Sequence, residues 1–259
     1  MWTIRQEQAE AFRQYHLQKF EDEMVEHLND FAPKFCEVRG EPCIRRVIRI
    51  GIERAAKYGF TNRGPVRFYI ELMISLGSDF DTDPQYPWAT DALGDQEFGS
   101  QAVRADRLFD QLCQYMDHVA GPKFQHTLDA LRRVQTVDFD SAQVPGNDLP
   151  SRMIARLRMI FPQKYTYVRE PILRKLVGRG LEMGGAYGIM SERGLTAIVG
   201  LMFGVGHGAV GDPLYPWVIA TLTDSKVKDP NVRAERLYRK AQIYCERMSA
   251  SLEAEQQHV

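Results

Sequence analysis

The sequence has few cysteines and almost no net charge, and both absences narrow the possible function classes. The cysteines form no C-x-x-C pair, so neither a disulfide framework nor a zinc site is indicated. The pattern is typical of free thiols in a reducing cytoplasm. The 33 basic and 34 acidic residues leave a net charge of −1, which argues against a chain-wide field that attracts nucleic acid or an anionic membrane. The four cysteines are Cys36, Cys43, Cys113 and Cys245.

Segments for targeting or membrane insertion are also missing. The first eight residues contain no apolar run of the kind that a signal peptide requires. The apolar stretch 195–210 falls short of the roughly 20 residues that span a bilayer. Its counterpart 66–82 carries Arg67 and Glu71. We therefore expect a cytoplasmic protein without membrane insertion, in which 195–205 is a helix buried between two lobes; the alternative is an exposed apolar groove for a partner.

Sequence motifs for catalysis and for cofactors are absent. The chain has no H-E-x-x-H and no G-x-S-x-G. The glycine-rich run 204–208 lacks the Lys-Ser/Thr of a phosphate-binding loop. The acidic turn 79–83 begins like a calcium loop, but Pro84 and Thr90 stand where the glycine and glutamate of that loop belong. We expect no catalytic residue, no cofactor and no metal, and we classify the chain as a non-enzyme.

An internal repeat is the strongest positive signal. Residues 41–109 align without a gap to residues 170–238, and 22 of the 69 aligned positions are identical. Unrelated segments of average composition would share roughly four. Two six-residue segments share five identities each, Asp83–Trp88 with Asp212–Trp217 and Val103–Leu108 with Val232–Leu237. Two copies indicate a pseudo-twofold body and not a solenoid, which needs three or more units.

The hydrophobic pattern predicts an all-α fold. Apolar residues recur at helical spacing, no segment alternates for long with period two, and prolines and glycines mark helix ends. We expect two pseudo-twofold-related helical lobes, at 1–134 and 151–259, joined by a linker at 135–150. The expected helices are 5–30, one starting at Pro42, one starting at Pro65, 89–93, 100–119, 124–134, 151–161, 171–187, 194–205 and 232–255.

Two aromatic turns and one glycine-rich helix are the candidate partner contacts. Aromatic anchors dominate many protein interfaces, but large aromatic side chains also fill cores. In this second interpretation each tryptophan fills its own lobe, and Asp83 or Asp212 accepts backbone N–H bonds in a capping turn. The candidate contact residues are Phe80, Asp81, Asp83, Tyr86, Trp88, Tyr215, Trp217, Leu201 and Phe203.

Three segments of the first 120 residues carry a resemblance to a known family. They are Ile48–Gly59, Tyr69–Gly77 and Phe80–Ala89, and the segment Gln6–Leu28 also matches. Together they resemble a bacterial accessory family encoded beside type VI secretion spike, adaptor and effector genes. The second copy departs from the pattern, because Gly200 stands where the first copy has Glu71. The resemblance implies an accessory role in effector loading and no catalytic residues.

Two hypotheses of function follow. The first is a protein-binding accessory factor or co-chaperone, whose partner is a secreted effector, an adaptor or a spike protein. The second is an immunity protein that neutralises a cognate toxin, with Asp79, Asp81 and Asp83 imitating a phosphate backbone. An enzyme of unrecognised type is a third class, which a deep pocket with perturbed titratable groups would reveal.

Overall fold

The protein is all-α, as a computed structural model of the 259-residue chain shows. The structure describes residues 6–95, 97, 99–136 and 144–257, so residues 137–143 of the expected linker lie outside the described part. No strand occurs within these ranges. Within the described ranges, no helix combines the length and the apolar character that a membrane span requires.

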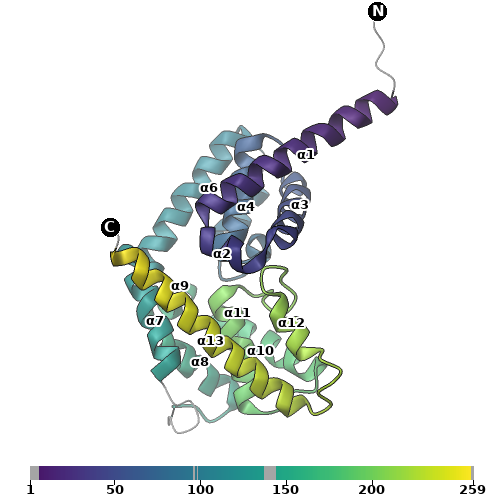
Figure 1. Ribbon diagram of the computed structural model, residues 1–259. Coiled ribbons are helices and arrows are strands. Elements are labelled where there is room, and N and C mark those ends of the chain that lie inside the picture. The colour runs from purple at the N-terminus through teal and green to yellow at the C-terminus, as the bar shows by residue number, and fades with distance from the viewer. Residues whose placement is uncertain (1–5, 96, 98, 137–143, 258–259) are drawn as a thin grey trace, which may run out of the picture.

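The first half of the chain begins with a long helix that leaves the body of the molecule (Figure 1). Shorter helices follow and fold back against its C-terminal part. In chain order the elements are α1 (Gln6–Phe31), α2 (Pro33–Arg39), α3 (Glu41–Lys57), α4 (Arg63–Leu76), the 3₁₀ turn η1 (Phe80–Thr82), α5 (Pro87–Gly94) and α6 (Gln101–Tyr115).

The second half repeats part of the helix order of the first half. After the π-helical turn η2 (Met116–Ala120), the turn η3 (Pro122–Phe124) and α7 (Gln125–Thr136), it runs through α8 (Leu149–Ile160), α9 (Pro162–Val168), α10 (Glu170–Ala186), α11 (Glu192–Val205), α12 (Pro216–Leu222) and α13 (Pro230–Gln257). Helices α9, α10 and α11 have the lengths of α2, α3 and α4, and start 129 residues after them, as 170 − 41 shows for α10. The pseudo-twofold relation of two lobes stays a prediction.

Proline and glycine set the helix boundaries. Pro33 and Pro162 begin α2 and α9, where the missing N–H of a first-turn residue costs nothing. The long helices α4 and α11 end at Gly77 and Gly206, whose φ angles are 101° and 111°. A side chain is strained in this left-handed region, so glycine is the residue that allows the chain to turn there.

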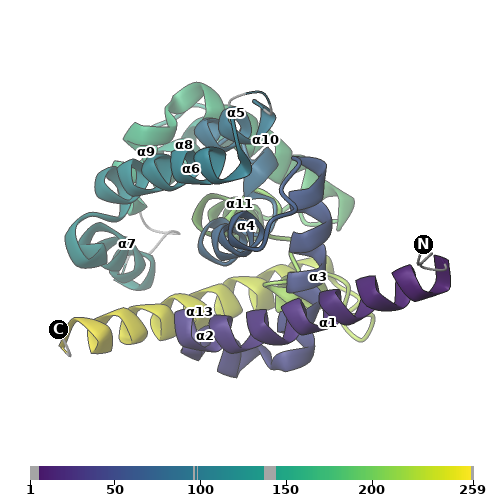
Figure 2. The same ribbon diagram turned by 90° about the horizontal axis from the view of Figure 1, so that it is seen from above.

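The two halves meet at the C-terminal ends of α4 and α11, which lie one above the other in the middle of the molecule (Figures 1 and 2). On one side of this centre lie α5, α6, α8 and α9, and on the other lie α1, α2 and α13 (Figure 2). Buried residues of both halves form one continuous core. The expected helix 194–205 is a buried element of that core, with Ile198, Met202 and Phe203 covered.

Helix α7 crosses the predicted domain division. It packs mainly along α13 and also touches α8, although the sequence assigned 124–134 to the first lobe. The domain boundaries at residues 134 and 151 stay predictions. Arg132 of α7 pairs with Glu253 of α13 at 2.7 Å, and Gln135 donates to the Ser249 hydroxyl at 3.0 Å. The connection between the halves therefore packs against a helix from the other end of the chain.

Candidate functional site

The turn after α4 and the turn after α11 touch each other closely. A Cβ atom on Gly206 would lie 3.0 Å from the carbonyl oxygen of Leu76, and one on Gly77 would overlap the carbonyl of Val205. No side chain fits at either position. The glycines therefore allow the two helix ends to approach backbone to backbone.

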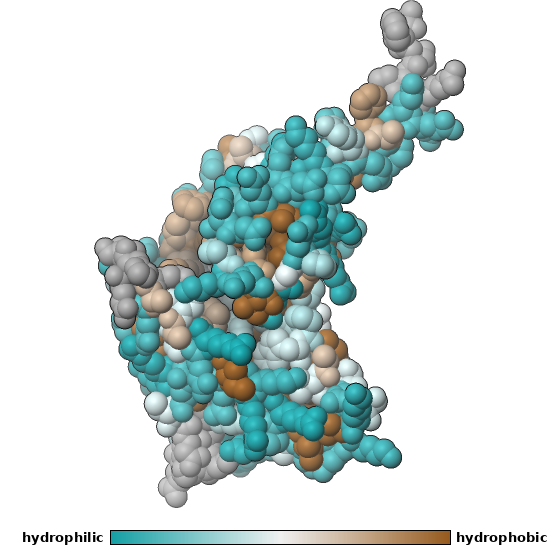
Figure 3. All heavy atoms as spheres, viewed as in Figure 1, coloured by the Kyte–Doolittle hydropathy of each residue, from teal (hydrophilic) through white to brown (hydrophobic). Residues whose placement is uncertain are grey.

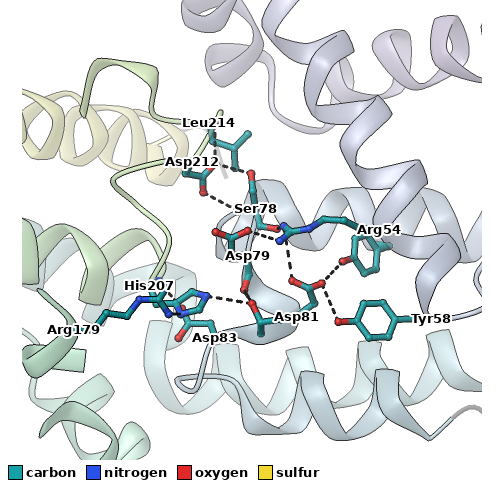
Figure 4. Close-up of polar contacts among 12 residues, drawn as sticks. Arg54, Tyr58, Ser78, Asp79, Asp81, Asp83, Arg179, His207, Asp212 and Leu214 are labelled. Atoms are coloured by element: carbon teal, nitrogen blue, oxygen red, sulfur yellow. Dashed lines mark hydrogen bonds and ion pairs between the residues drawn. The ribbon is translucent and has the colours of Figure 1, made fainter. Parts of the chain in front are cut away.

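Two buried aspartates connect these turns in a reciprocal way (Figure 4). The Asp83 carboxylate accepts a hydrogen bond from the backbone N–H of His207 at 2.7 Å. The Asp212 carboxylate accepts from the backbone N–H of Ser78 at 2.8 Å and from its hydroxyl at 2.6 Å. Ser78 and His207 hold corresponding positions in the repeat, as do the two aspartates. Each half thus supplies the acceptor that the turn of the other half needs.

Each aspartate also holds its own turn. Asp83 accepts from the backbone N–H of Gln85 at 2.9 Å, and Asp212 accepts from that of Leu214 at 2.8 Å. The sequence interpretation of both residues as capping aspartates is confirmed. Burial raises the pKa of Asp212, and its bonds to Ser78 and Leu214 oppose that rise.

A second cluster beside the junction belongs to the first half (Figure 4). The Asp81 carboxylate accepts from the hydroxyls of Tyr58 and Tyr69 at 3.0 and 2.8 Å. Arg54 pairs with Asp79 at 2.5 Å and lies 3.9 Å from Asp81. Burial raises the pKa of Tyr58 to about 12 and also raises the pKa of Tyr69. Both tyrosines therefore stay protonated and donate to the carboxylate.

The Asp79 carboxylate of the first copy fits at the junction because the second copy has a glycine, Gly208, against it. Gly208 corresponds to Asp79 in the repeat. A Cβ on Gly208 would overlap the Asp79 carboxylate. The loss of a carboxylate in the second copy is therefore a packing requirement of the junction.

A lysine is buried at the same junction. The Lys164 ammonium donates to the carbonyl oxygen of Phe203 in the last turn of α11 at 2.6 Å, and it lies 3.4 Å from the Tyr86 hydroxyl. A cation is favoured at a helix C-terminus by the helix dipole. Burial nevertheless lowers the pKa of Lys164 to about 8, although the negative charge of Asp83 raises it.

A groove of about 890 Å³ opens next to this junction, and residues of α5 and α9 line it. Its walls combine aromatic, aliphatic and polar side chains from both halves of the chain. Trp88 and Tyr167 both pack against Tyr115, at ring-centroid distances of 6.3 and 5.2 Å. The lining residues are Gln85, Pro87, Trp88, Asp91, His118, Pro162, Gln163, Thr166, Tyr167, Val168, Arg169 and Ile172.

Three lining residues carry a buried polar atom that lacks a hydrogen-bond partner among the described residues. These atoms are Oε1 of Gln85, Nε1 of Trp88 and Oε1 of Gln163. Leaving such an atom unpaired costs about 1–3 kcal/mol. Three residues that line one groove therefore each carry a polar atom without a hydrogen-bond partner among the described residues.

Arg169 lines the groove in a strained conformation. Its φ and ψ are 69° and 148° at the N-cap of α10, and Gly40 has nearly the same values, 74° and 155°, at the N-cap of α3. This region suits glycine alone, and another residue held in it costs about 1–3 kcal/mol. The second half thus keeps a large exposed cation where the first half has the relaxed residue.

Most of the predicted contact residues are buried. Trp217 is partly covered and is the most accessible of the nine, while Trp88, 9% exposed, lines the groove. The structure brings Asp83, Tyr86 and Phe203 together around Lys164. The remaining buried members are Phe80, Asp81, Leu201 and Tyr215. The role of the nine residues as partner contacts stays a prediction. Among them, partly exposed Trp217 and groove-lining Trp88 are the two that a partner could reach.

The sequence reasoning missed Gln85, Gln163, Tyr167 and Arg169. A signal for Arg169 was present, because extending the repeat alignment by one position pairs it with Gly40. The polar atoms of the two glutamines gave no such signal. Their unmet hydrogen bonding follows from the tertiary packing alone.

Comparison of the chain with protein-family models, with curated proteins and with solved structures found no match. What the fold and the site define is an all-α chain with a groove that residues from the middle of the sequence line, between Gln85 and Ile172. Among the described residues no group of three or more His, Cys, Asp or Glu side chains is placed to hold a metal ion.

Proposed function

We propose that the protein is a non-catalytic, cytoplasmic protein-binding module, which acts as an accessory factor or co-chaperone in loading a type VI secretion effector or its adaptor. The observation that carries this proposal is the groove between α5 and α9, with apolar walls and three unpaired polar atoms. Concave sites of this composition are typical of ligand recognition. The secretion context comes from the resemblance of the first 120 residues.

The hydrogen bonds that occupy the buried carboxylates support a binding role and not a catalytic one. Asp83 and Asp212 are occupied by backbone amides of the opposite turn, and Asp81 by two tyrosine hydroxyls. A general base must reach the proton that it removes. These three groups are 3% exposed or less, so a substrate has no access to them.

The same burial weighs against the immunity alternative in the form that relies on an acidic patch. Asp81 and Asp83 lie inside the molecule, and Asp79 is paired with Arg54. A patch that imitates a phosphate backbone has to be exposed. The accessory proposal is therefore the one that the arrangement of charges favours.

Co-expression with the neighbouring spike, adaptor and effector gene products tests the proposal. The expected result is a stable complex at micromolar concentration that Thr166→Arg disrupts, because Thr166 is an exposed residue of the groove. Thr223→Arg is the matched control, since both hydroxyls bond the carbonyl four residues earlier and only Thr166 lies at the groove. Elution of the wild-type chain alone, with each product present, contradicts the proposal. Rescue of toxin-producing cells by this chain would instead establish the immunity function.

A further inference from the structure

A second hollow lies in the first half, where the C-terminal part of α1, helix α2 and the start of α3 pack together (Figure 1). This pocket has a volume of about 450 Å³. Cys36 and Ile44 are its buried lining residues, with 5% and 2% exposed, whereas Asn29, Glu37 and Glu41 are exposed to solvent. A partner can therefore reach the charged groups of the pocket. The lining is completed by Val25, Pro33 and Gly40.

The internal repeat places the same three-helix arrangement in the second half, where α8, α9 and α10 pack together. Helices α1 and α8 end at Phe31 and Ile160, 129 residues apart, as 160 − 31 shows. The N-cap residues of α2 and α9 have nearly the same φ, −141° and −135°. The pocket and its counterpart can therefore be compared residue by residue.

The second half carries two large side chains where the pocket has smaller ones. Tyr165 corresponds to Cys36, and Arg158 corresponds to Asn29. The Arg158 guanidinium lies over the Tyr165 ring, 5.6 Å from its centroid. The Tyr165 hydroxyl donates to Oε2 of Glu170 at 3.3 Å. In the second half the chain itself thus supplies an aromatic ring and a cation to this site.

Glu41 is the counterpart of Glu170 and can make the same contact. In both halves an arginine four residues later binds Oε1 of the glutamate at 2.7 Å. Oε2 of Glu170 then accepts from the tyrosine, whereas the Cys36 thiol donates to the carbonyl oxygen of Leu28 at 3.2 Å. The Glu41 side chain is 58% exposed, so its Oε2 is open to a hydroxyl donor from a partner.

The charge of the pocket favours a cation. Its lining contains the carboxylates of Glu37 and Glu41 and no basic residue, which gives a formal charge of −2. The counterpart positions hold one glutamate and two arginines, and threonine stands in place of Glu37, so their formal charge is +1. Arg45 pairs with Glu41, but the Glu21 and Asp22 carboxylates share it at 3.1 and 2.7 Å. A positively charged partner group therefore complements the pocket.

We infer that the pocket is the docking site for a segment of the partner protein that presents a tyrosine beside an arginine. The phenol ring packs on the buried lining residues, and its hydroxyl donates to Oε2 of Glu41 as that of Tyr165 does to Glu170. The guanidinium pairs with Glu37. The inference rests on the proposed binding function and adds to it a second contact with a stated chemistry.

The δ1-methyl signals of the isoleucines, labelled with ¹³C in the full-length chain, give a direct measurement. Ile44→Val assigns the signal of the pocket, and Ile189→Val assigns a control signal from a buried residue outside its lining. The probe is an equimolar pool of the acetylated and amidated peptides Ala-Tyr-Arg-Ala and Ala-Arg-Tyr-Ala. The Ile44 signal should move with this pool and the Ile189 signal should not. An unmoved Ile44 signal with millimolar peptide overturns the inference.

Two matched pools separate the hydroxyl from the charge. In one pool phenylalanine replaces the tyrosine, and in the other glutamine replaces the arginine. Each should bind about fivefold more weakly than the first pool, because one hydrogen bond or one ion pair is lost. Equal binding of all three pools overturns the inference.

The double variant Asn29→Arg and Cys36→Tyr gives the pocket the two side chains of the second half. It should abolish peptide binding, because the ring and the cation then come from the chain itself. The melting temperature should stay unchanged or rise, because the new side chains fill an existing hollow. Cys113→Tyr adds a ring at an exposed cysteine of α6 and is the control that should bind as the wild type does. A folded double variant with wild-type affinity overturns the inference.

The variant Glu37→Thr tests the cation contact at an exposed position, with the residue that the second half has. It should weaken the first pool about fivefold, to the level of the glutamine pool, and leave the glutamine pool unchanged. Glu7→Thr removes an exposed carboxylate from the far end of α1 and is the control that should not change peptide affinity. Equal affinity of Glu37→Thr and wild type for the first pool overturns the pairing with Glu37.

The two proposals fail in different ways. A partner complex that forms and is blocked by Thr166→Arg, with every peptide pool leaving Ile44 unmoved, refutes the tyrosine and arginine segment and preserves the binding function. Peptide binding that depends on Glu37, with no complex formed by any neighbouring product, supports the docking chemistry and refutes the proposed secretion role.

Discussion

The Asp83 carboxylate binds the backbone amide of His207, 124 residues further along the chain. The same carboxylate also accepts from the backbone N–H and the side-chain amide of Gln85. Because all these groups are buried, water cannot replace the carboxylate. One side chain thus fixes its own turn and the end of a helix in the other half.

Replacing Asp83 by alanine leaves three buried donors unpaired. The free energy of unfolding should fall by about 3 kcal/mol or more, as measured by denaturant titration. Hydrogen exchange at the His207 amide should accelerate more than exchange at the amides inside α11. Ser78→Ala is a milder comparison, because it removes one donor and leaves the Ser78 backbone bond to Asp212 intact. A stability unchanged within 0.5 kcal/mol by the Asp83 substitution, on the usual scale for surface changes, would show that the junction does not hold the halves together.

Lys164 should make the protein more stable as the pH rises from 8 toward 10.5. Its pKa is lowered by burial from 10.5 to about 8 in the folded state. Between these values the unfolded chain binds more protons than the folded one, so the free energy of unfolding rises with pH, by an amount on the order of 3 kcal/mol. Below pH 8 both states are protonated and the contribution is constant. The measurement compares urea denaturation of wild type and Lys164→Met across this window, and the variant should lack the rise because methionine does not titrate. Parallel curves for the two proteins would contradict the prediction.

Gly208 and Asp79 should be energetically coupled. Gly208→Ala places a methyl group against the Asp79 carboxylate, and we expect a loss of about 2 kcal/mol from this overpacking. In an Asp79→Ala background the same substitution should cost less than in the wild type, since the carboxylate is gone and only the Cβ at position 79, 3.2 Å away, remains. Gly211→Ala serves as a control, because no atom lies within 4 Å of a Cβ at that glycine. Additive effects of the two substitutions in a double-mutant cycle would refute the coupling.

The projecting part of α1 should be dispensable for stability. Residues 6–19 are all exposed, including Phe12 at 61% and Tyr15 at 63%, and this part of the helix stands away from the body in Figure 3. Deletion of residues 1–19 should change the free energy of unfolding by less than about 0.5 kcal/mol. Glu21→Ala, just beyond, should cost more, since the buried Glu21 carboxylate binds Arg49 at 2.8 Å and Arg45 at 3.1 Å. Thermal unfolding of the two variants checks both expectations, and a deletion that destabilises as much as Glu21→Ala would show that the projection is supported.

The fold class and the larger helices could be predicted from the sequence, because they depend on local periodicity. The expected helix 5–30 is α1, Gln6–Phe31, and the expected helix 194–205 lies within α11. The seven-residue helices α2, α9 and α12 were missed. Pro33 begins α2 after a single residue that separates it from α1, so the sequence shows no loop between the two helices. Such short helices carry too few residues for a periodic signal.

The site was predictable only in its local parts. The capping roles of Asp83 and Asp212 follow from the residue type and the proline after each. Their bonds to His207 and Ser78 depend on how the helix ends meet, which no local pattern encodes. The predicted contact residues were taken from the two aromatic turns and the glycine-rich helix, and burial places most of them in the core.

The hydrogen bonds from each aspartate to the opposite turn also determine when the junction can form during synthesis. The N–H of Ser78 is made early, but its acceptor on Asp212 does not exist until 134 more residues have been added. A ribosome-bound chain that ends before residue 212 therefore holds a first half whose central turn is still unpaired. The native junction can close only after most of the second half has left the exit tunnel, so the completed protein assembles its centre last.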